Sequence, residues 1–325
     1  MPSLPQAKAF IALLILICLP SVTEARKVRI AVATLSQSVL PLVVAQEKGY
    51  FKEENLDVEL ILSTASVANM ALLGGNVDFI SSGTTAIAAI SRRAPLKFVF
   101  VSFSRPMHWL YARPEIDDLK KLKGKKIGVS AVGASLYFLI LEILRRHGLD
   151  PAHDVMLVGS GTTANRYAAL QSGIIDATNL TPPYNFRAQE SGLRELVAFV
   201  EEDYLLDLAG TMVVREDLSP ILLEKCLRSA VKGLLHIRQR RASTVPILAK
   251  LMKIEENLAD KVYDMVLPGL TTDGSLDLEI QKKVLDFVVK IQGIKEPVSV
   301  ERVFDFLPLR KIRNDLAVNK WRPTL

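Results

Sequence analysis

Hydroxyl residues and glycines gather in short polar segments of this chain, and they are its best candidates for binding a small ligand. The segments are residues 34–38, 81–85, 102–105, 130–137, 161–165 and 181–184. Residues 82–84 and 133–135 lie at expected helix starts, where free backbone N–H groups and the helix dipole favour an anionic or strongly polar group. Serine and threonine are also common N-caps, so capping alone would explain the same residues.

A few larger side chains lie near these segments. Arg105 could pair with a carboxylate or sulfonate through two parallel hydrogen bonds. Trp109 could form an apolar wall, although an exposed arginine and a tryptophan packed within a lobe would fit these positions equally well. Tyr184 follows two prolines and could close one side of a binding cleft. The residues that we predict to contact a ligand are Ser36, Gln37, Ser82, Gly83, Thr84, Arg105, Gly133, Ala134, Ser135, Thr181 and Tyr184.

The residues that catalysis or metal binding would need are not arranged for it. None of the histidines, at positions 108, 147, 153 and 236, lies at a metal-ligand spacing from another. The chain has no Gly-x-Ser-x-Gly elbow and no phosphate loop ending in Lys-Ser/Thr. We therefore predict that the protein is not an enzyme, with no catalytic residue, no metal and no cofactor.

The N-terminus has the pattern of an export signal. Lys8 precedes an apolar run at residues 9–19, which is followed by Pro20 and by a small residue, Ala25. This pattern is typical of a cleavable signal peptide, and the run is shorter than the roughly 20 residues that span a bilayer. We predict a signal peptide over residues 1–25 and a periplasmic protein. The alternative is an uncleaved membrane anchor.

Composition limits the possible partners further. Cys18 would be lost with the signal, which leaves Cys226 as a single thiol that cannot form an internal disulfide. The net charge is +6 over 325 residues, and the basic clusters at residues 120–126 and 238–241 are short. A nucleic-acid surface would need a basic stripe with interleaved aromatic residues, so we predict no nucleic-acid partner. We also expect a monomer.

Strands alternate with helices through most of the chain. The strands predicted first are residues 27–34, 57–62, 77–81 and 96–103, separated by helices at 41–49, 66–73 and 84–92. The pattern restarts with a short helix at 116–123, strands at 125–130, 155–159 and 176–180, and helices at 136–147 and 165–172. Helices follow at about 220–241, 245–252, 255–266, 278–291 and 300–304. Such alternation predicts parallel βαβ units, whose ligands lie beyond the carboxyl ends of the strands.

An internal echo suggests two equivalent lobes. Residues 71–78 and 169–176 share a helix end, a glycine stop, a β-branched entry and an aspartate. Common helix-to-strand chemistry would also produce this match. We predict a first lobe at 26–105, a second at 106–207, and a return to the first lobe with C-terminal helices at 208–325. The hinge would lie in crossovers near 102–111 and 200–213.

The ordered motifs resemble a known family. They are Glu47-Lys48-Gly49-Tyr50-Phe51, then residues 55–58, 73–79, 119–129 and 169–176, and finally Pro182-Pro183-Tyr184. Together they resemble the nitrate/sulfonate/taurine-type substrate-binding proteins of ABC importers, a group that includes thiamine-precursor binders. The resemblance implies a type II periplasmic-binding-protein fold: α/β, with two Rossmann-like lobes joined by two crossovers and a ligand in the cleft. A eukaryotic branch that makes the thiamine pyrimidine uses a cysteine-rich motif and iron, which a single remaining cysteine does not match.

The resemblance implies a solute-binding protein that delivers a small polar ligand, anionic or heterocyclic, to an ABC permease and ATPase complex. Sulfonates, nitrate, pyrimidines and aromatic carboxylates all suit pockets lined by serine, threonine and glycine. The alternative is a periplasmic ligand sensor that is not coupled to transport.

Overall fold

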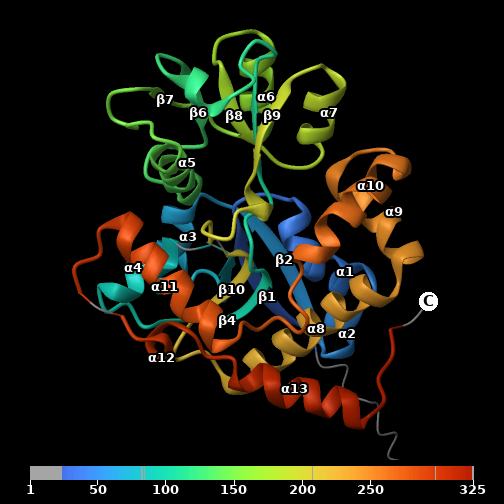
Figure 1. The fold of residues 1–325 in the computed structure, drawn as a ribbon. Coiled ribbons are helices and arrows are strands. Elements are labelled where there is room, and N and C mark those ends of the chain that lie inside the picture. Colours follow the sequence, from blue (N-terminus) through green and yellow to red (C-terminus); the bar gives the residue numbers. More distant parts are fainter. Residues whose placement is uncertain (1–23, 82, 84, 207, 297, 324–325) are drawn as a thin grey trace, which may run out of the picture.

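The computed structural model describes residues 24–323 apart from residues 82, 84, 207 and 297. The predicted signal peptide lies almost wholly outside the described residues, as do the candidate site residues Ser82 and Thr84. Two five-stranded sheets form two α/β lobes, drawn one above the other in Figure 1. This confirms the predicted architecture of two lobes joined by two crossovers.

The first sheet has the strand order β2-β1-β3-β10-β4. Its strands are β1 (Arg26–Val32), β2 (Leu56–Leu62), β3 (Phe79–Ser81), β4 (Leu96–Phe103) and β10 (Ala209–Arg215). The elements between them are the 3-10 turn η1 (Gln37–Val39) and the helices α1 (Leu40–Glu47), α2 (Tyr50–Glu53), α3 (Ala65–Leu73) and α4 (Thr85–Ser91). Strands β1, β2 and β3 are parallel, whereas β10 is antiparallel to β3 and β4.

The second sheet repeats this arrangement with the order β7-β6-β8-β5-β9. Its strands are β5 (Trp109–Ala112), β6 (Lys126–Val129), β7 (Met156–Gly159), β8 (Ala177–Leu180) and β9 (Arg194–Ala198). Around them lie η2 (Leu119–Leu122), α5 (Ser135–Arg146), α6 (Thr163–Gln171), α7 (Tyr184–Glu190) and η3 (Phe199–Glu201). The predicted helix at 116–123 is therefore only a short 3-10 turn.

Each lobe contains the predicted parallel βαβ units together with one antiparallel strand that was not predicted. The chain leaves the first sheet at the end of β4 and enters the second as β5; it leaves the second after β9 and returns as β10. A strand that enters directly from the other lobe starts at the edge where the parallel strands end. It must therefore run antiparallel to them, as β5 and β10 do.

The internal echo corresponds to the same contact in both lobes. Asp78 accepts a hydrogen bond from the backbone N–H of Arg29 at 2.9 Å, and Asp176 accepts one from Lys126 at 2.8 Å. Asp78 thereby ties the entry of β3 to β1, and Asp176 ties the entry of β8 to β6. The glycine of each copy, Gly75 and Gly173, has positive φ. The repeated residues thus set the strand register twice.

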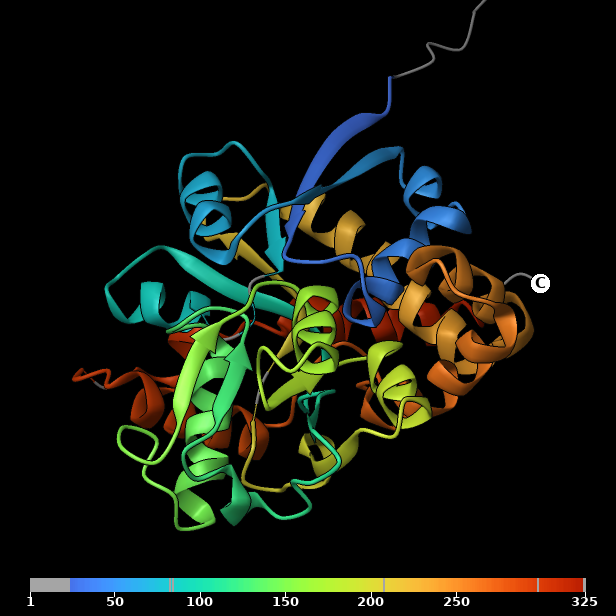
Figure 2. The same ribbon diagram turned by 90° about the horizontal axis from the view of Figure 1, so that it is seen from above.

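The C-terminal helices enlarge the first lobe. They are α8 (Pro220–Gln239), α9 (Arg241–Met252), α10 (Glu256–Val266), the 3-10 turn η4 (Leu267–Gly269), α11 (Leu278–Gln292), α12 (Val300–Val303) and α13 (Leu307–Val318). In Figures 1 and 2, α9 and α10 lie together beside α1. The predicted helix at 220–241 ends at Gln239 because Arg240 leaves the helical conformation, with φ −135° and ψ 65°. In the part of the chain that the structure describes, no helix is long and apolar enough to cross a membrane.

The Gly49–Phe51 motif shapes the first lobe at the end away from the cleft. Gly49 has φ 75°, the left-handed conformation predicted for it. Tyr50 is fully buried, its hydroxyl lies 2.8 Å from Nδ1 of His236, and its ring packs edge-on against Trp321. Glu53 pairs with Lys232 on α8 at 2.6 Å. The motif therefore anchors α2 to the C-terminal helices.

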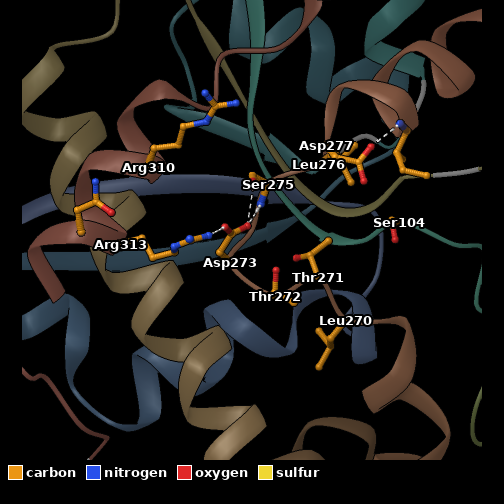
Figure 3. Close-up of a pocket in the computed structure, with 12 residues that line it drawn as sticks. Ser104, Leu270, Thr271, Thr272, Asp273, Ser275, Leu276, Asp277, Arg310 and Arg313 are labelled. Carbon is orange, nitrogen blue, oxygen red and sulfur yellow. Dashed lines mark hydrogen bonds and ion pairs between the residues drawn. The ribbon is translucent and has the colours of Figure 1, made fainter. Parts of the chain in front are cut away.

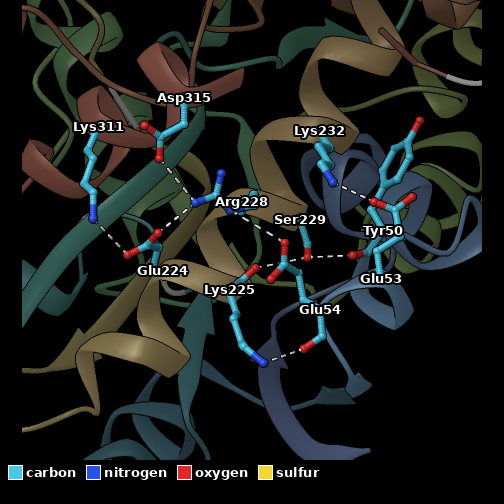
Figure 4. A network of polar contacts seen from close by, with 10 residues as sticks. All are labelled: Tyr50, Glu53, Glu54, Glu224, Lys225, Arg228, Ser229, Lys232, Lys311 and Asp315. Atoms are coloured by element: carbon cyan, nitrogen blue, oxygen red, sulfur yellow. Dashed lines mark hydrogen bonds and ion pairs between the residues drawn. The ribbon is translucent and has the colours of Figure 1, made fainter. Parts of the chain in front are cut away.

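A polar network continues this anchor (Figure 4). Arg228 on α8 lies 2.7 Å from Glu224, 3.4 Å from Asp315 on α13 and 3.6 Å from Glu54. Because only about a fifth of the Arg228 side chain is exposed, these carboxylates depend on it for charge compensation.

Candidate functional site

A cavity of about 220 Å³ lies between the two lobes. The first lobe contributes residues that follow β1 and β3, and the second lobe contributes residues that follow β6. The crossover into β10 also contributes to the wall. Its walls are Ala33, Thr34, Ser38, Val39, Ala65, Ser81, Gly83, Thr85, Ser130, Ala134, Ser135, Leu136, Leu208, Ala209 and Gly210. These are mainly carboxyl-end residues, the position at which ligands bind in open α/β sheets.

Helix α5 gives the cavity a site suited to negative charge. Its N-cap is Ala134, whose own side chain makes no capping hydrogen bond. Because Ala134, Ser135 and Leu136 all line the cavity, the positive end of the α5 dipole is directed to its wall and can stabilise an anionic group. None of the wall residues is acidic.

The structure brings only some of the predicted site residues to this cavity. Gly83, Ala134 and Ser135 line it. Ser36 instead caps η1, where its hydroxyl accepts from the N–H of Ser38 at 3.4 Å. Gln37 is buried beside it, and its Oε1 has no hydrogen-bond partner among the described residues.

The other predicted residues lie elsewhere. Arg105 is exposed and donates to the carbonyl of Val200 at 3.0 Å, which ties one crossover to the other. Thr181 precedes α7, and Tyr184 begins it with its ring 5.5 Å from that of Tyr167. Gly133 borders a second hollow rather than the cavity itself.

A buried cation at the cleft edge of the second sheet was not predicted. Arg166 on α6 is 2% exposed and donates to the carbonyls of Gly161 and Asn179 and to the hydroxyl of Thr163. No carboxylate pairs with it within the range that the structure describes. Burial lowers the pKa of Arg166 to about 10, so it stays charged at neutral pH. It gives this end of the lobe a positive potential.

His108 and Asn179 complete this cluster. Burial and the charge of Arg166 lower the pKa of His108 to about 3, so the ring is neutral. Nδ2 of Asn179 lies 3.4 Å from Nδ1 of His108. The buried Oδ1 of Asn179 has no hydrogen-bond partner among the described residues. The sequence alone gives no sign that Arg166 is buried, because a helical arginine is normally solvated.

A separate hollow of about 610 Å³ lies between α13 and the loop before α11 (Figure 3). Asp273 accepts from the N–H and hydroxyl of Ser275 at 2.9 and 2.6 Å and pairs with Arg313. Ser104, from the first crossover, also lines this hollow. Because the Asp273 carboxylate already has partners and no residue of the second lobe lines the hollow, we do not assign the ligand here.

Two kinds of reactive group bear on catalysis, clusters of metal ligands and the remaining cysteine. No group of three or more His, Cys, Asp or Glu among them could hold a metal ion. Cys226 is fully buried on α8, and burial raises the pKa of its thiol. It is therefore a packed, protonated side chain at neutral pH, which is typical of a structural cysteine.

Comparison with known proteins points to one family. The model described as NMT1/THI5 like matches residues 36–217. YtlA of Bacillus subtilis, named as a binding protein, is 28% identical over 187 residues, which cover 54% of this chain and 55% of YtlA. The 4-amino-5-hydroxymethyl-2-methylpyrimidine phosphate synthase THI13 of Saccharomyces cerevisiae is 32% identical over 143 residues, 42% of this chain and 41% of that protein. The chain thus spans about half the length of these curated relatives or less.

The fold is shared with solved periplasmic binding proteins. The aliphatic sulphonate binding protein SsuA of Escherichia coli superposes with a TM-score of 0.66 at 20% identity, over 86% of this chain and 97% of that one. Other similar structures are a ligand-binding component of an ABC-type import system from Staphylococcus aureus and, among enzymes, the desulfurization enzyme DSZB, with TM-scores of 0.71 and 0.67. The predicted periplasmic-binding-protein fold is thereby confirmed.

Proposed function

Because this chain belongs to the NMT1/THI5-like family, we propose that it is the exported solute-binding protein of an ABC importer. It binds a small polar ligand, anionic or heterocyclic, between its lobes and delivers it to a permease and its ATPase. The observation that carries this proposal is the cavity, whose walls come from both lobes and from the crossover into β10.

A cavity built in this way couples binding to closure. Its two sets of walls move relative to each other when the crossovers near 102–111 and 200–213 bend. A ligand that contacts both lobes therefore binds the closed state more tightly than the open one and shifts the population towards it. A permease can recognise the closed state selectively, which is what delivery requires.

Charge supports an anionic or strongly polar ligand. The N-terminal end of α5 lines the cavity, and the buried Arg166 lies at the same edge of the second sheet. SsuA is named for binding an aliphatic sulphonate, and the yeast relative for making a pyrimidine phosphate. Sulfonates and substituted pyrimidines are therefore the first ligand classes to test.

The enzymatic alternative has less support from the residues. The fungal relatives are named as synthases, but the thiol of Cys226 is buried and protonated. We propose a binding protein without catalysis, with a signal over 1–25, lobes at 26–105 and 106–207, and the remainder of the first lobe at 208–325. It would act in the periplasm as a monomer.

Thermal-shift screening of the mature protein against sulfonates, nitrate, pyrimidines and aromatic carboxylates tests this proposal. A ligand at 100 times its dissociation constant stabilises the folded state by about 2.7 kcal/mol, which is a clear rise in melting temperature. No shift with any of these classes would count against the proposal. Uptake in vesicles that carry the cognate permease and ATPase separates transport from the sensor alternative, which predicts binding without uptake.

A further inference from the structure

A second hollow adjoins the cavity between the lobes. Its volume is about 900 Å³, and it shares Ala65 and Thr85 with the cavity as wall residues. Helices α3 and α4 form one side, Gly133 and Phe138 of the second lobe form another, and residues 292–296 complete it. We call the cavity the inner pocket and this hollow the outer pocket.

The outer pocket carries positive charge that the protein leaves uncompensated. Arg92 and Arg93, at the end of α4, both line it and are exposed. Neither guanidinium has an ion pair or a hydrogen bond to another described residue. Lys295 is a third cation in the wall, against the single acidic residue Glu296. The excess of positive charge favours an anion.

Asn69 adds an unsatisfied acceptor near the junction of the pockets. Its Nδ2 donates to the carbonyl of Ala65, the shared wall residue, at 2.9 Å. Its Oδ1 is buried and accepts no hydrogen bond from the described residues. Because a buried polar atom without a partner is unfavourable, rotation of the Asn69 side chain towards a ligand donor in the outer pocket would cost little.

The backbone at Arg93 points to a role for its side chain. Arg93 has φ 68°, and its N–H donates to the carbonyl of Ile90 as α4 ends. Glycine occupies this left-handed position after α3 and α5, at Gly75 and Gly148. Arginine is less favourable than glycine in this conformation. Its presence is consistent with a side chain that is needed in the outer pocket.

We infer that the ligand has two parts, a compact polar head in the inner pocket and an anionic tail, phosphate or sulfonate, in the outer pocket. This inference rests on the proposed function. At about 220 Å³ the inner pocket is smaller than the roughly 300–1,000 Å³ of most small-molecule sites, so a larger ligand must extend outwards. Two guanidinium groups in the wall of one pocket suit an oxyanion, because each can donate two hydrogen bonds to phosphate or sulfonate oxygens.

Calorimetric titration with matched probes tests the inference. The probes are hydroxymethylpyrimidine, pyridoxine and hydroxyethylthiazole, each paired with its phosphate monoester, and propanesulfonate paired with propanedisulfonate. Two cations, each about 6 Å from an anion in a water-like dielectric, together attract it by about 1.4 kcal/mol. This lowers the dissociation constant about tenfold. We therefore expect the member with the anionic tail to bind about tenfold more tightly, with a smaller advantage at high ionic strength.

Variants identify the source of that advantage. The double variant Arg92→Gln/Arg93→Gln should abolish the tighter binding of the anionic probe. It should leave the affinity for the probe without the anionic tail unchanged. Arg145→Gln/Lys261→Gln removes the same charge from exposed residues outside both pockets and should keep the tighter binding. Arg93→Gly should raise the melting temperature and still weaken binding of the anionic member, which separates binding from folding.

The outcomes distinguish the two proposals. If no probe binds the wild-type protein, this inference fails, and the proposed function fails with it only when the thermal-shift screen also finds no ligand. If probes bind but the anionic tail gives no advantage, or if the advantage survives in Arg92→Gln/Arg93→Gln, only the two-part ligand is overturned.

Discussion

Replacing Gly210 with alanine tests how closely the second crossover packs against the first lobe. Gly210 has φ 63°, and a Cβ atom built on it would lie 1.9 Å from the carbonyl oxygen of Ser38 and 2.6 Å from Oγ of Ser102. The left-handed conformation costs alanine about 1–2 kcal/mol, and overpacking adds about 1–3 kcal/mol. We expect Gly210→Ala to lower the free energy of unfolding by about 3–4 kcal/mol.

Gly133→Ala is the matched control, because Gly133 also has positive φ, 82°, but nothing lies within 4 Å of its added Cβ. It should cost only the conformational part, about 1–2 kcal/mol. Urea unfolding of both variants measures the difference. Equal destabilisation by the two substitutions would refute the close packing of Gly210 between Ser38 and Ser102.

Two further predictions concern the end of the first lobe away from the cleft. Burial, with the charges of Lys48 and Arg240, lowers the pKa of His236 to about 4. The unfolded state, with a histidine pKa near 6.5, therefore binds more protons, so up to about 3 kcal/mol of stability is lost as the pH falls from 6.5 to 4. Urea unfolding between pH 6.5 and 4 should show that His236→Gln loses less free energy of unfolding than the wild type. Identical pH dependence in the two proteins would mean that His236 is not the group responsible. Arg228→Ala should destabilise the protein by about 3 kcal/mol, because Glu54, Glu224 and Asp315 lose their shared partner. Lys311→Ala, at the exposed edge of this network, should cost under about 1 kcal/mol, and equal effects would mean that Arg228 adds no more than a surface pair.

Local pattern was enough to predict the elements that form from neighbouring residues. The strand predicted at 96–103 is β4, Leu96–Phe103, because a run of buried apolar residues between turns has few alternatives. The repeated helix-to-strand passages correctly indicated two equivalent lobes, since Asp78 and Asp176 make the same local contact in each.

The elements that depend on distant partners were not predicted. Strand β5 has only four residues, all buried, and it exists because β8 and β9 flank it. Strand β10 reads as the start of the helical region until it is paired with β4. Neither segment has a distinctive periodicity, because its surroundings are set by the crossover and not by its own sequence.

The same limit applies to the candidate site. The rule that ligands bind at the carboxyl ends of strands selected the loops that contain Gly83, Ala134 and Ser135, and the structure places these residues in the wall of the inner pocket. It could not show that Arg105 bonds to the carbonyl of Val200, 95 residues further along. Nor could it show that Arg166 is buried, because a helical arginine is normally solvated.

A crystal structure of the protein with a ligand found by the thermal-shift screen tests the central claim most directly. The account predicts one ligand in the inner pocket, contacted by residues 33–39 or 81–85 of the first lobe and by residues 130–136 of the second. A ligand held by one lobe alone, or bound in the hollow beside Asp273, would contradict it.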